Sequence, residues 1–460
     1  MKVLRAVRLA LFELTVASSP VFPQSGNELL ARLISEDDAR RGTARVAILR
    51  SHDRSLIPAL VDALFFAPTV ARTDVVACLE GLSGEKLGPR HRYWVEWVGG
   101  HGEIHPHDGY RAWKSSLFSR IDLAFGSFLD PGRPLAIRAE EIVWGGVKKD
   151  GLPALKSPRT VPLREARSFS DSEVVFGVGF GGQFRAYPQR ILDWHEMVND
   201  VVGGQPFVIS YCTLCGSAVA YGTRFPDGRV LAFGSSGLLY RSNKLMYDEQ
   251  TLSLWSNLTG EAVAGPLFSS KARLPILALT VTSWREWRSL HPETTILSLE
   301  TGYRRDYSVG AAYGRYFASP DTMFPVWTRD DRLEAKAWVY ALRSGAKARA
   351  YPLELLALER VVNDAIGAVP IVLVADPESG SVRAYYRGSH EFTEGPAGFL
   401  AEPSTGAAWK IGEDALVPQS SPAAPLPRFP GHRAYWFGWY AFFPETSLYE
   451  GCVGVAPGGR

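Results

Sequence analysis

The 460-residue sequence has little of what builds the common scaffolds. Its four cysteines are too few for a disulfide framework. No run approaches the ~18 to 20 apolar residues that a bilayer span needs, so we expect no transmembrane span in the mature chain. The formal charge is only +2, because 50 basic residues nearly balance 48 acidic ones. That balance gives no reason to expect a nucleic-acid partner.

The signatures of several enzyme classes are also missing. No G-x-S-x-G elbow of the serine hydrolases occurs, and no carboxylate pair stands out as a glycosidase would require. The run FGSSGLLYRS lacks the lysine and the spacing of a phosphate-binding loop, so no nucleotide cofactor is predicted. A hydrophobic content of 46% with 21% charged residues describes a globular protein, and the length favours two or three domains.

The first 25 residues have the order of a secretory signal peptide. Three basic residues precede an apolar run, and small residues follow around Ala17. Glu13 interrupts the apolar run, and the alternative is an amphipathic first helix. The sequence therefore predicts a signal peptide over residues 1–25 and a periplasmic or extracytoplasmic protein. If this segment is not cleaved, the protein would be cytoplasmic.

The next part of the chain predicts helices. Over residues 27–88, apolar residues recur at spacings of three and four, as in SLIPALVDALFF. The stretch resembles one or two HEAT-like helical units, which commonly pack on other proteins, so we expect a protein partner for this segment. Residues 89–165 follow as an aromatic and histidine-containing connector, whose Gly and Pro spacing fixes no metal-ligand geometry.

The rest of the chain repeats itself. Residues 185–221 align with 349–385 without a gap, and 15 of the 37 positions are identical. Further matches follow in the same order, such as WREWRSLHPETTILSL with WFGWYAFFPETSLYEG. We predict an α+β fold with two tandem copies of a mixed, largely antiparallel β domain, each with one main helix. The first copy covers 166–305, and a degenerate second copy covers 332–455.

The first copy contains an unusual histidine. His195 continues the apolar stripe that runs from Ile191 to Val202 at three- and four-residue spacings. This spacing predicts one helix that carries the ring inward. The second copy has Glu359 at the same position.

Cys212 and Cys215 have the form strand-Cys-x-x-Cys-Gly-strand, which is typical of a metal knuckle. With His195 they would supply three soft ligands for copper or zinc and leave a fourth position open. All three residues differ together in the second copy, as loss of one shared site would produce. Met246, Arg241 and Asn243 are candidates for a further ligand or for a pocket, and the Met246 thioether would suit copper. For Met246, a place in the core is favoured over a ligand role.

Two other functions fit the same residues. The Cys212/Cys215 pair could serve a thiol–disulfide or peroxide-handling enzyme, with His195 lowering a thiol pKa. Alternatively, the chain is a non-catalytic binding or structural module in which these cysteines form a disulfide. Cys78 is expected to be a buried apolar residue, and Cys452 to be inert or paired.

Several motifs in order resemble a known family. FRAYPQRILDWHEMVNDVVGGQPFVISYCTLCGSAVAYG, LAFGSSGLLYRSNKLMYDEQTLSLWSNLTGEAVAGPL and SWREWRSLHPET are similar to the bacterial and archaeal domain of unknown function family 3179. The close resemblance covers about 166–300. It implies that His195, Cys212 and Cys215 lie in characteristic family motifs and that members often look exported. It implies no activity.

Overall fold

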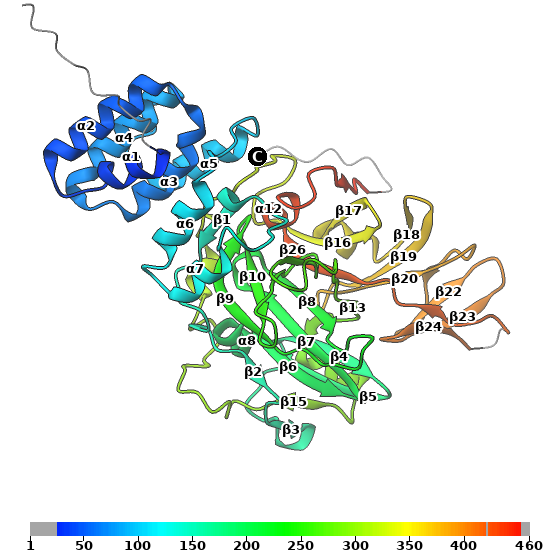
Figure 1. Ribbon diagram of the computed structural model, residues 1–460. Helices are drawn as coiled ribbons and strands as arrows, with labels where there is room; N and C mark the ends of the chain where they lie inside the picture. The colour runs from blue at the N-terminus through cyan, green and yellow to red at the C-terminus, as the bar shows by residue number, and fades with distance from the viewer. Residues whose placement is uncertain (1–24, 420–421, 452–460) are drawn as a thin grey trace, which may run out of the picture.

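The computed structural model describes residues 25–419 and 422–451. The protein is mixed α and β, with helices at one end and several sheets beyond them (Figure 1). The predicted signal peptide, apart from Ser25, and Cys452 lie outside the described residues. Among the described helices, none has the length and apolar character that a bilayer crossing needs.

The N-terminal region is helical well beyond the predicted limit. Its helices are α1 (Gly26–Leu33), α2 (Asp38–Ser51), α3 (Ile57–Phe66), α4 (Thr69–Ser83), α5 (His91–Gly100), α6 (Tyr110–Phe118) and α7 (Leu123–Phe128). Acidic N-caps start several of them: Asp37 accepts a hydrogen bond at α2 and Asp122 at α7. The last three helices lie in the stretch that the sequence left as a connector, because frequent Gly and Pro hid short helices there.

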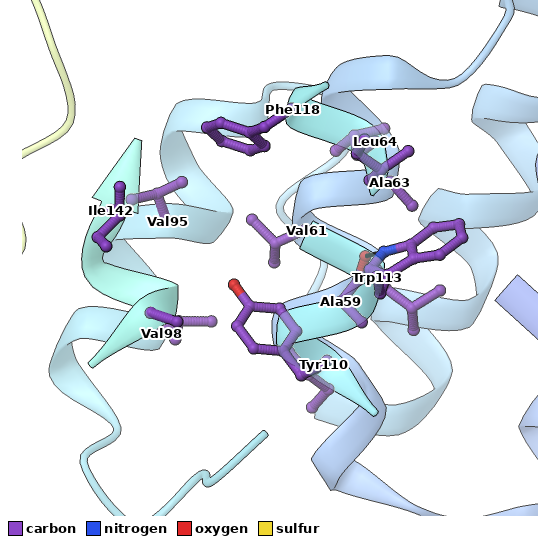
Figure 2. Packing of buried hydrophobic residues seen from close by; sticks show 14 of the residues in the cluster. Ala59, Val61, Ala63, Leu64, Val95, Val98, Tyr110, Trp113, Phe118 and Ile142 are labelled. Carbon is purple, nitrogen blue, oxygen red and sulfur yellow. Dashed lines mark hydrogen bonds between the residues drawn. The ribbon is translucent and has the colours of Figure 1, made fainter. Parts of the chain in front are cut away.

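The helical region shares its core with the sheets. Ile142 of the first strand lies against Val95 and Val98 of α5 (Figure 2). The same cluster continues into the β region through residues such as Leu245 and Leu254. Burial of apolar surface on both sides therefore stabilises the attachment of the helices to the sheets.

We call residues 142–297 the first half of the β region. Its strands are β1 (Ile142–Trp144), β2 (Leu155–Lys156), β3 (Thr160–Pro162), β4 (Val174–Phe180), β5 (Gln183–Pro188), β6 (Met197–Val202), β7 (Gln205–Cys212), β8 (Ser217–Gly222), β9 (Phe233–Tyr240), β10 (Asn243–Asp248), β11 (Leu254–Ser256), β12 (Ala262–Ala264), β13 (Ile276–Leu277), β14 (Thr280–Ser283) and β15 (Thr295–Leu297). Helices α8 (Gln189–His195) and α9 (Trp284–Leu290) lie among them, and α10 (Gly314–Ala318) follows.

Residues 338–448 form the second half. Its elements are β16 (Trp338–Ser344), β17 (Lys347–Pro352), α11 (Leu353–Glu359), β18 (Val361–Ile366), β19 (Val369–Asp376), β20 (Ser381–Tyr386), β21 (Thr393–Glu394), β22 (Phe399–Glu402), β23 (Ala407–Ile411), β24 (Ala415–Pro418), β25 (Leu426–Pro427), β26 (Gly431–Tyr435), α12 (Trp436–Tyr440) and β27 (Ser447–Leu448).

The sheets of the two halves follow corresponding orders. The first half contains β14-β4-β5-β15-β3, and the second contains β26-β16-β17-β27. Each sheet contains one parallel pair at the corresponding place: β15 runs parallel to β5, and β27 runs parallel to β17. Most other pairings are antiparallel, as predicted, for example β6 with β7 and β18 with β19.

One predicted helix is shorter than expected. The sequence predicted a helix that continued past His195 to Val202, but α8 ends at His195. Glu196 takes a left-handed conformation with φ 55°, and β6 starts at Met197. The apolar spacing fitted a helix by coincidence, because alternation along MVNDVV also buries one face of a strand. β6 pairs with β7 from Met197↔Ser210 onward.

Candidate functional site

The two central cysteines lie on one tight turn of the first half. Cys212 is the last residue of β7, and Cys215 ends the 3₁₀ turn η4 (Thr213–Cys215). Gly216 then takes φ 61° and lets the chain enter β8, where Ser217 pairs with Cys212. The prediction that CTLCG joins two strands is confirmed. Both cysteines are free thiols and fully buried.

The second half packs directly on this turn. A side chain at Gly216 would lie 2.4 Å from the Trp338 ring, and one at Gly438 of α12 would lie 3.0 Å from Cys215 Sγ. Tyr316 closes another side, because its hydroxyl donates a hydrogen bond of 2.5 Å to the carbonyl of Leu214. The thiols are therefore enclosed by residues from three separate parts of the chain.

The hairpin of β9 and β10 supplies polar groups to the thiols. Cys215 Sγ donates to the carbonyl of Ser242 at 3.0 Å. Asn243 Nδ2 donates to Ser217 Oγ at 3.0 Å, and Asn243 also hydrogen bonds to Cys215. Asn257 Nδ2 donates to Asn243 Oδ1 at 2.8 Å, which fixes the orientation of the Asn243 amide. Asn243, predicted as a pocket residue, thus lies at the site.

A buried ion pair lies beside Cys212. Lys244 Nζ donates to the backbone carbonyl of Glu196 at 2.9 Å and lies 3.7 Å from its carboxylate. Ser235 Oγ donates to that carboxylate at 3.3 Å. Burial lowers the pKa of Lys244 and raises that of Glu196, while the opposite charge of each partner counteracts both shifts.

The two thiols differ in acidity. Burial and the negative charge of Glu196 raise the pKa of Cys212, but the neighbouring Cys215 and the positive charge of Lys244 outweigh them, so its pKa lies below the ordinary value. Burial, and then the bond to Cys212 and its charge, hold the pKa of Cys215 well above the ordinary value. Cys212 is therefore the thiol that ionises first, and Cys215 retains its proton.

A buried carboxyl group faces the same region. Asp193 of α8 is 4% exposed, and burial raises its pKa to about 7. Its Oδ1 has no hydrogen-bond partner among the described residues. The Asp193 charge contributes, after burial, to the raised pKa values of Tyr211 and Tyr435, and Cys215 acts on Tyr435 as well. A proton-exchanging carboxyl group thus belongs to the surroundings of the thiols.

The imidazole of His195 is held elsewhere. Its Nδ1 lies 2.8 Å from the carbonyl of Pro153, and its Nε2 lies 2.5 Å from the hydroxyl of Tyr307. The residue is fully buried, as predicted, and burial lowers its pKa. Because both ring nitrogens have protein partners, neither is directed at a ligand position shared with the thiols.

The residues at hand do not form the expected three-ligand set. Within 25–419 and 422–451, no group of three or more His, Cys, Asp or Glu side chains is placed to hold a metal ion. The structure brings Cys212 and Cys215 together and gives His195 separate partners. Two thiols alone do not complete the four-coordinate shell that is usual for zinc.

The two other predicted pocket residues also point away from the thiols. Met246 is buried in the cluster that contains Met197, Phe233 and Trp255, and the core interpretation holds for it. Arg241 forms an ion pair with Glu141, and its NH1 donates to the carbonyl of Ala441 at 2.9 Å. Arg241 therefore links the hairpin to the helical region and to α12.

Sequence reasoning missed Asp193, Glu196 and Lys244. Glu196 stood inside the over-long predicted helix, and a single aspartate such as Asp193 has no distinctive signal in the sequence. The signal for Lys244 was present, because a lysine within the apolar run around LMY is costly to bury without a partner.

A family model described as "Protein of unknown function (DUF3179)" matches residues 149–446 as one unit. The match thus extends through the second half, beyond the 166–300 region of close resemblance seen in the sequence. No curated protein and no solved structure matches the chain.

Proposed function

Because the chain belongs to the DUF3179 family, whose description assigns no activity, we propose a function from the chemistry of its thiols. The proposal is a buried dithiol–disulfide centre that reduces a small hydroperoxide. The observation that carries it is the pair of buried free thiols on one tight turn, of which Cys212 is the more acidic and Cys215 the less acidic. In such a pair the thiolate, Cys212, attacks the peroxide, and the thiol, Cys215, then forms the disulfide.

In the proposed reaction the Cys212 thiolate attacks the distal oxygen of the hydroperoxide. An S–O bond forms, the O–O bond breaks, and the alkoxide or hydroxide takes one proton and leaves as alcohol or water. The Cys215 sulfur then attacks the sulfenic acid, releases water and forms the disulfide. The thiol pair loses two electrons and two protons in all, which is equivalent to two hydrogen atoms. A small dithiol would return the pair to its reduced form.

Burial supports a small reaction partner. Neither sulfur has any exposed surface, and Tyr316 and Trp338 cover the turn. A protein disulfide would have to bring its own sulfur into line with Cys212, which this covering prevents. A hydroperoxide needs far less space, so it fits the proposal better than exchange with a protein.

The copper or zinc site stays a prediction. Cys212 and Cys215 would provide two thiolate ligands, and the remaining positions would need groups that have other partners here, as both nitrogens of His195 do. We therefore derive no reaction step from a metal. Periplasmic export also stays a prediction, and fractionation of cells that express the full-length chain would test it.

The experiment starts from full-length protein purified without oxygen and treated with one equivalent of hydrogen peroxide. Intact mass spectrometry should show loss of two hydrogen atoms, and peptide mapping should join Cys212 to Cys215. Cys215→Ser should stop at a sulfenic acid on Cys212, and Cys212→Ser should not react. Cys78→Ser is the matched control, because burial raises the pKa of this third buried thiol to about 12.

Three results would contradict the proposal. One is a peroxide reaction rate no faster than that of the Cys212→Ser variant. Another is oxidation spread equally over Cys78. The third is a stoichiometric copper or zinc ion that is lost in the Cys212→Ser, Cys215→Ser variant, which would favour the metal site instead.

We also infer that the two halves are copies of one unit. Tyr187 donates to Asp200 at 2.7 Å, and Tyr351 donates to Asp364 at 2.9 Å. These pairs support the inference because a shift of 164 residues relates both members. The HEAT-like character of α1–α4, and a protein partner for them, remain proposals that pull-down with the helical surface variant Val70→Glu would test.

A further inference from the structure

The two halves differ in the length of one hairpin. Asn199 holds Phe233 through two hydrogen bonds, and Asn363 holds Phe392 in the same way. From Phe233 the chain reaches Asp248 over residues 233–248. From Phe392 it reaches Glu402 over the shorter stretch 392–402. Each of these carboxylates accepts from a tryptophan indole, Trp255 or Trp409. The second hairpin is therefore five residues shorter.

The shorter hairpin leaves space in the second half. In the first half, the longer hairpin brings Ser242, Asn243 and Lys244 to the thiol turn. In the second half, Arg360 stands at the position of Glu196, and Asp376 at the position of Cys212. Both of these residues line a cavity of about 260 Å³ instead.

The cavity has apolar walls and a short loop at its edge. Val361 and Val374 come from the paired strands β18 and β19, and Phe399 and Leu400 come from β22. The loop Gly395–Gly398 borders the opening. Such a mostly apolar cavity with a few polar groups is the usual form of a small-molecule site.

The charges on the cavity wall do not balance. Three carboxylates and two guanidinium groups line it: Glu286, Asp376, Glu394, Arg360 and Arg383. Arg360 pairs with Glu394 at 2.9 Å. Buried Arg383 pairs with Glu286 at 3.1 Å and with Glu413, which is not part of the wall, at 2.8 Å.

Asp376 is the carboxylate without a cation. Its Oδ2 accepts from Ser379 Oγ at 2.7 Å, and its Oδ1 accepts from the amide of Glu378 at 3.1 Å. No basic side chain of the described residues forms an ion pair with it. A neighbouring cavity shares Asp376 and Glu286 and adds Glu378, while its Asp171 forms an ion pair with Arg285.

From this arrangement we propose that the second-half cavity binds a small organic cation, a primary ammonium group on an apolar body. The ammonium group donates to Asp376, and the apolar body lies against Val361, Val374 and Phe399. An anionic ligand would have to displace a carboxylate from Arg360 or Arg383, since both guanidinium groups are already paired. The two halves would then use the same place in the fold for different purposes, thiol chemistry and binding.

Isothermal titration of the full-length protein with phenethylamine tests the proposal, with phenethyl alcohol and phenylacetate as neutral and anionic probes. The amine should bind most tightly, and added salt should weaken it. Asp376→Asn keeps the acceptor for Ser379 but removes the charge, so it should weaken the amine roughly tenfold or more. Binding of the alcohol should stay the same.

A second variant and a control distinguish binding in the cavity from nonspecific electrostatic attraction of the amine to the protein. Val374→Phe fills the apolar wall and should abolish binding of the amine. Glu300→Gln removes an exposed carboxylate of the segment that follows β15 and should leave binding unchanged. If Val374→Phe unfolds, Asp376→Asn decides alone. Equal binding of amine and alcohol, tighter binding of phenylacetate, or an Asp376→Asn protein that binds the amine normally would overturn the proposal.

Discussion

Asp376 and Cys212 occupy the same position at the end of equivalent strands. Cys212 pairs with Ser217 across its turn, and Asp376 pairs with Ser381. Three residues further on, Cys215 Sγ donates to the carbonyl of Ser242 in the first half, while Ser379 Oγ donates to Asp376 in the second. The two turns therefore differ in their side chains: the first carries two thiols, and the second carries an Asp–Ser hydrogen bond. These side chains decide what chemistry each turn can perform.

Neutralising the Glu196–Lys244 pair should make Cys212 more acidic. The double variant Lys244→Met, Glu196→Gln removes both charges of the buried pair, so that neither is left unpaired. Because the Glu196 charge raises the pKa of Cys212 more than the Lys244 charge lowers it, loss of both should lower this pKa and speed alkylation at neutral pH. The alkylation rate as a function of pH measures this, and Glu300→Gln serves as the control. A slower reaction would contradict the prediction.

Asp193 should make the protein less stable as the pH rises. Its pKa is about 7 in the folded protein, against 3.8 ordinarily, so the folded state keeps a proton that the unfolded state releases. The free energy of unfolding should therefore fall between about pH 4 and pH 7, by on the order of 4 kcal/mol at most. Asp193→Asn should flatten this part of the profile.

Urea unfolding at several pH values, compared between wild type and Asp193→Asn, gives the difference directly. The comparison isolates Asp193 because all other groups titrate in both proteins. A constant difference from pH 4 to pH 8 would show that Asp193 titrates normally in the folded state.

The tyrosine–aspartate pairs should contribute unequally to stability. Tyr187→Phe removes a hydrogen bond to the buried Asp200 carboxylate and should cost about 1.5 to 3 kcal/mol. Tyr351→Phe should cost less, because Asp364 is more exposed to water. Chemical denaturation of the two variants checks the order, and a larger loss for Tyr351→Phe would contradict it.

Glu413 should be the most sensitive carboxylate of the second half. Burial opposes its charge, but Arg383, then His291 and Arg428, outweigh burial and hold its pKa well below the ordinary value. Its contribution to stability is therefore present above about pH 4.5 and lost only as the pH falls through the low folded pKa. Glu413→Gln leaves buried Arg428 without its carboxylate and Arg383 with Glu286 alone, and should cost about 3 to 5 kcal/mol in urea unfolding at pH 7. A loss below ~0.5 kcal/mol, as expected of an exposed residue such as Glu300, would contradict this.

Much of the architecture was predictable from local patterns. The repeat gave matched strands in matched order, and the strand–turn–strand form around Cys212 followed from the lack of helical periodicity after Gly216. The helix past His195 was wrong because Val198 and Val202, which lie on the buried face of β6, also satisfy part of a helical spacing. The left-handed Glu196, which ends α8, has no clear signature in sequence.

The candidate site was predictable only in part. The sulfur pair is local in sequence, so its two members could be assigned to each other. Lys244 and Asp193 approach it through tertiary packing, from β10 and α8, and no spacing along the chain encodes that approach. The partners of His195, Pro153 and Tyr307, are 42 and 112 residues away, which is why its role could not be inferred from its neighbours.

Trp338 and Gly438 contact the cysteine turn, so the second half of the β region covers the thiols. A protein truncated before Trp338 would retain both sulfurs, Lys244 and Asn243, yet its thiols would meet water and bulky reagents. Such a protein would still react with oxidants but would no longer favour small ones over large ones. Under the proposed function, discrimination between substrates would depend on the contact between the two halves and not on the residues that carry out the chemistry.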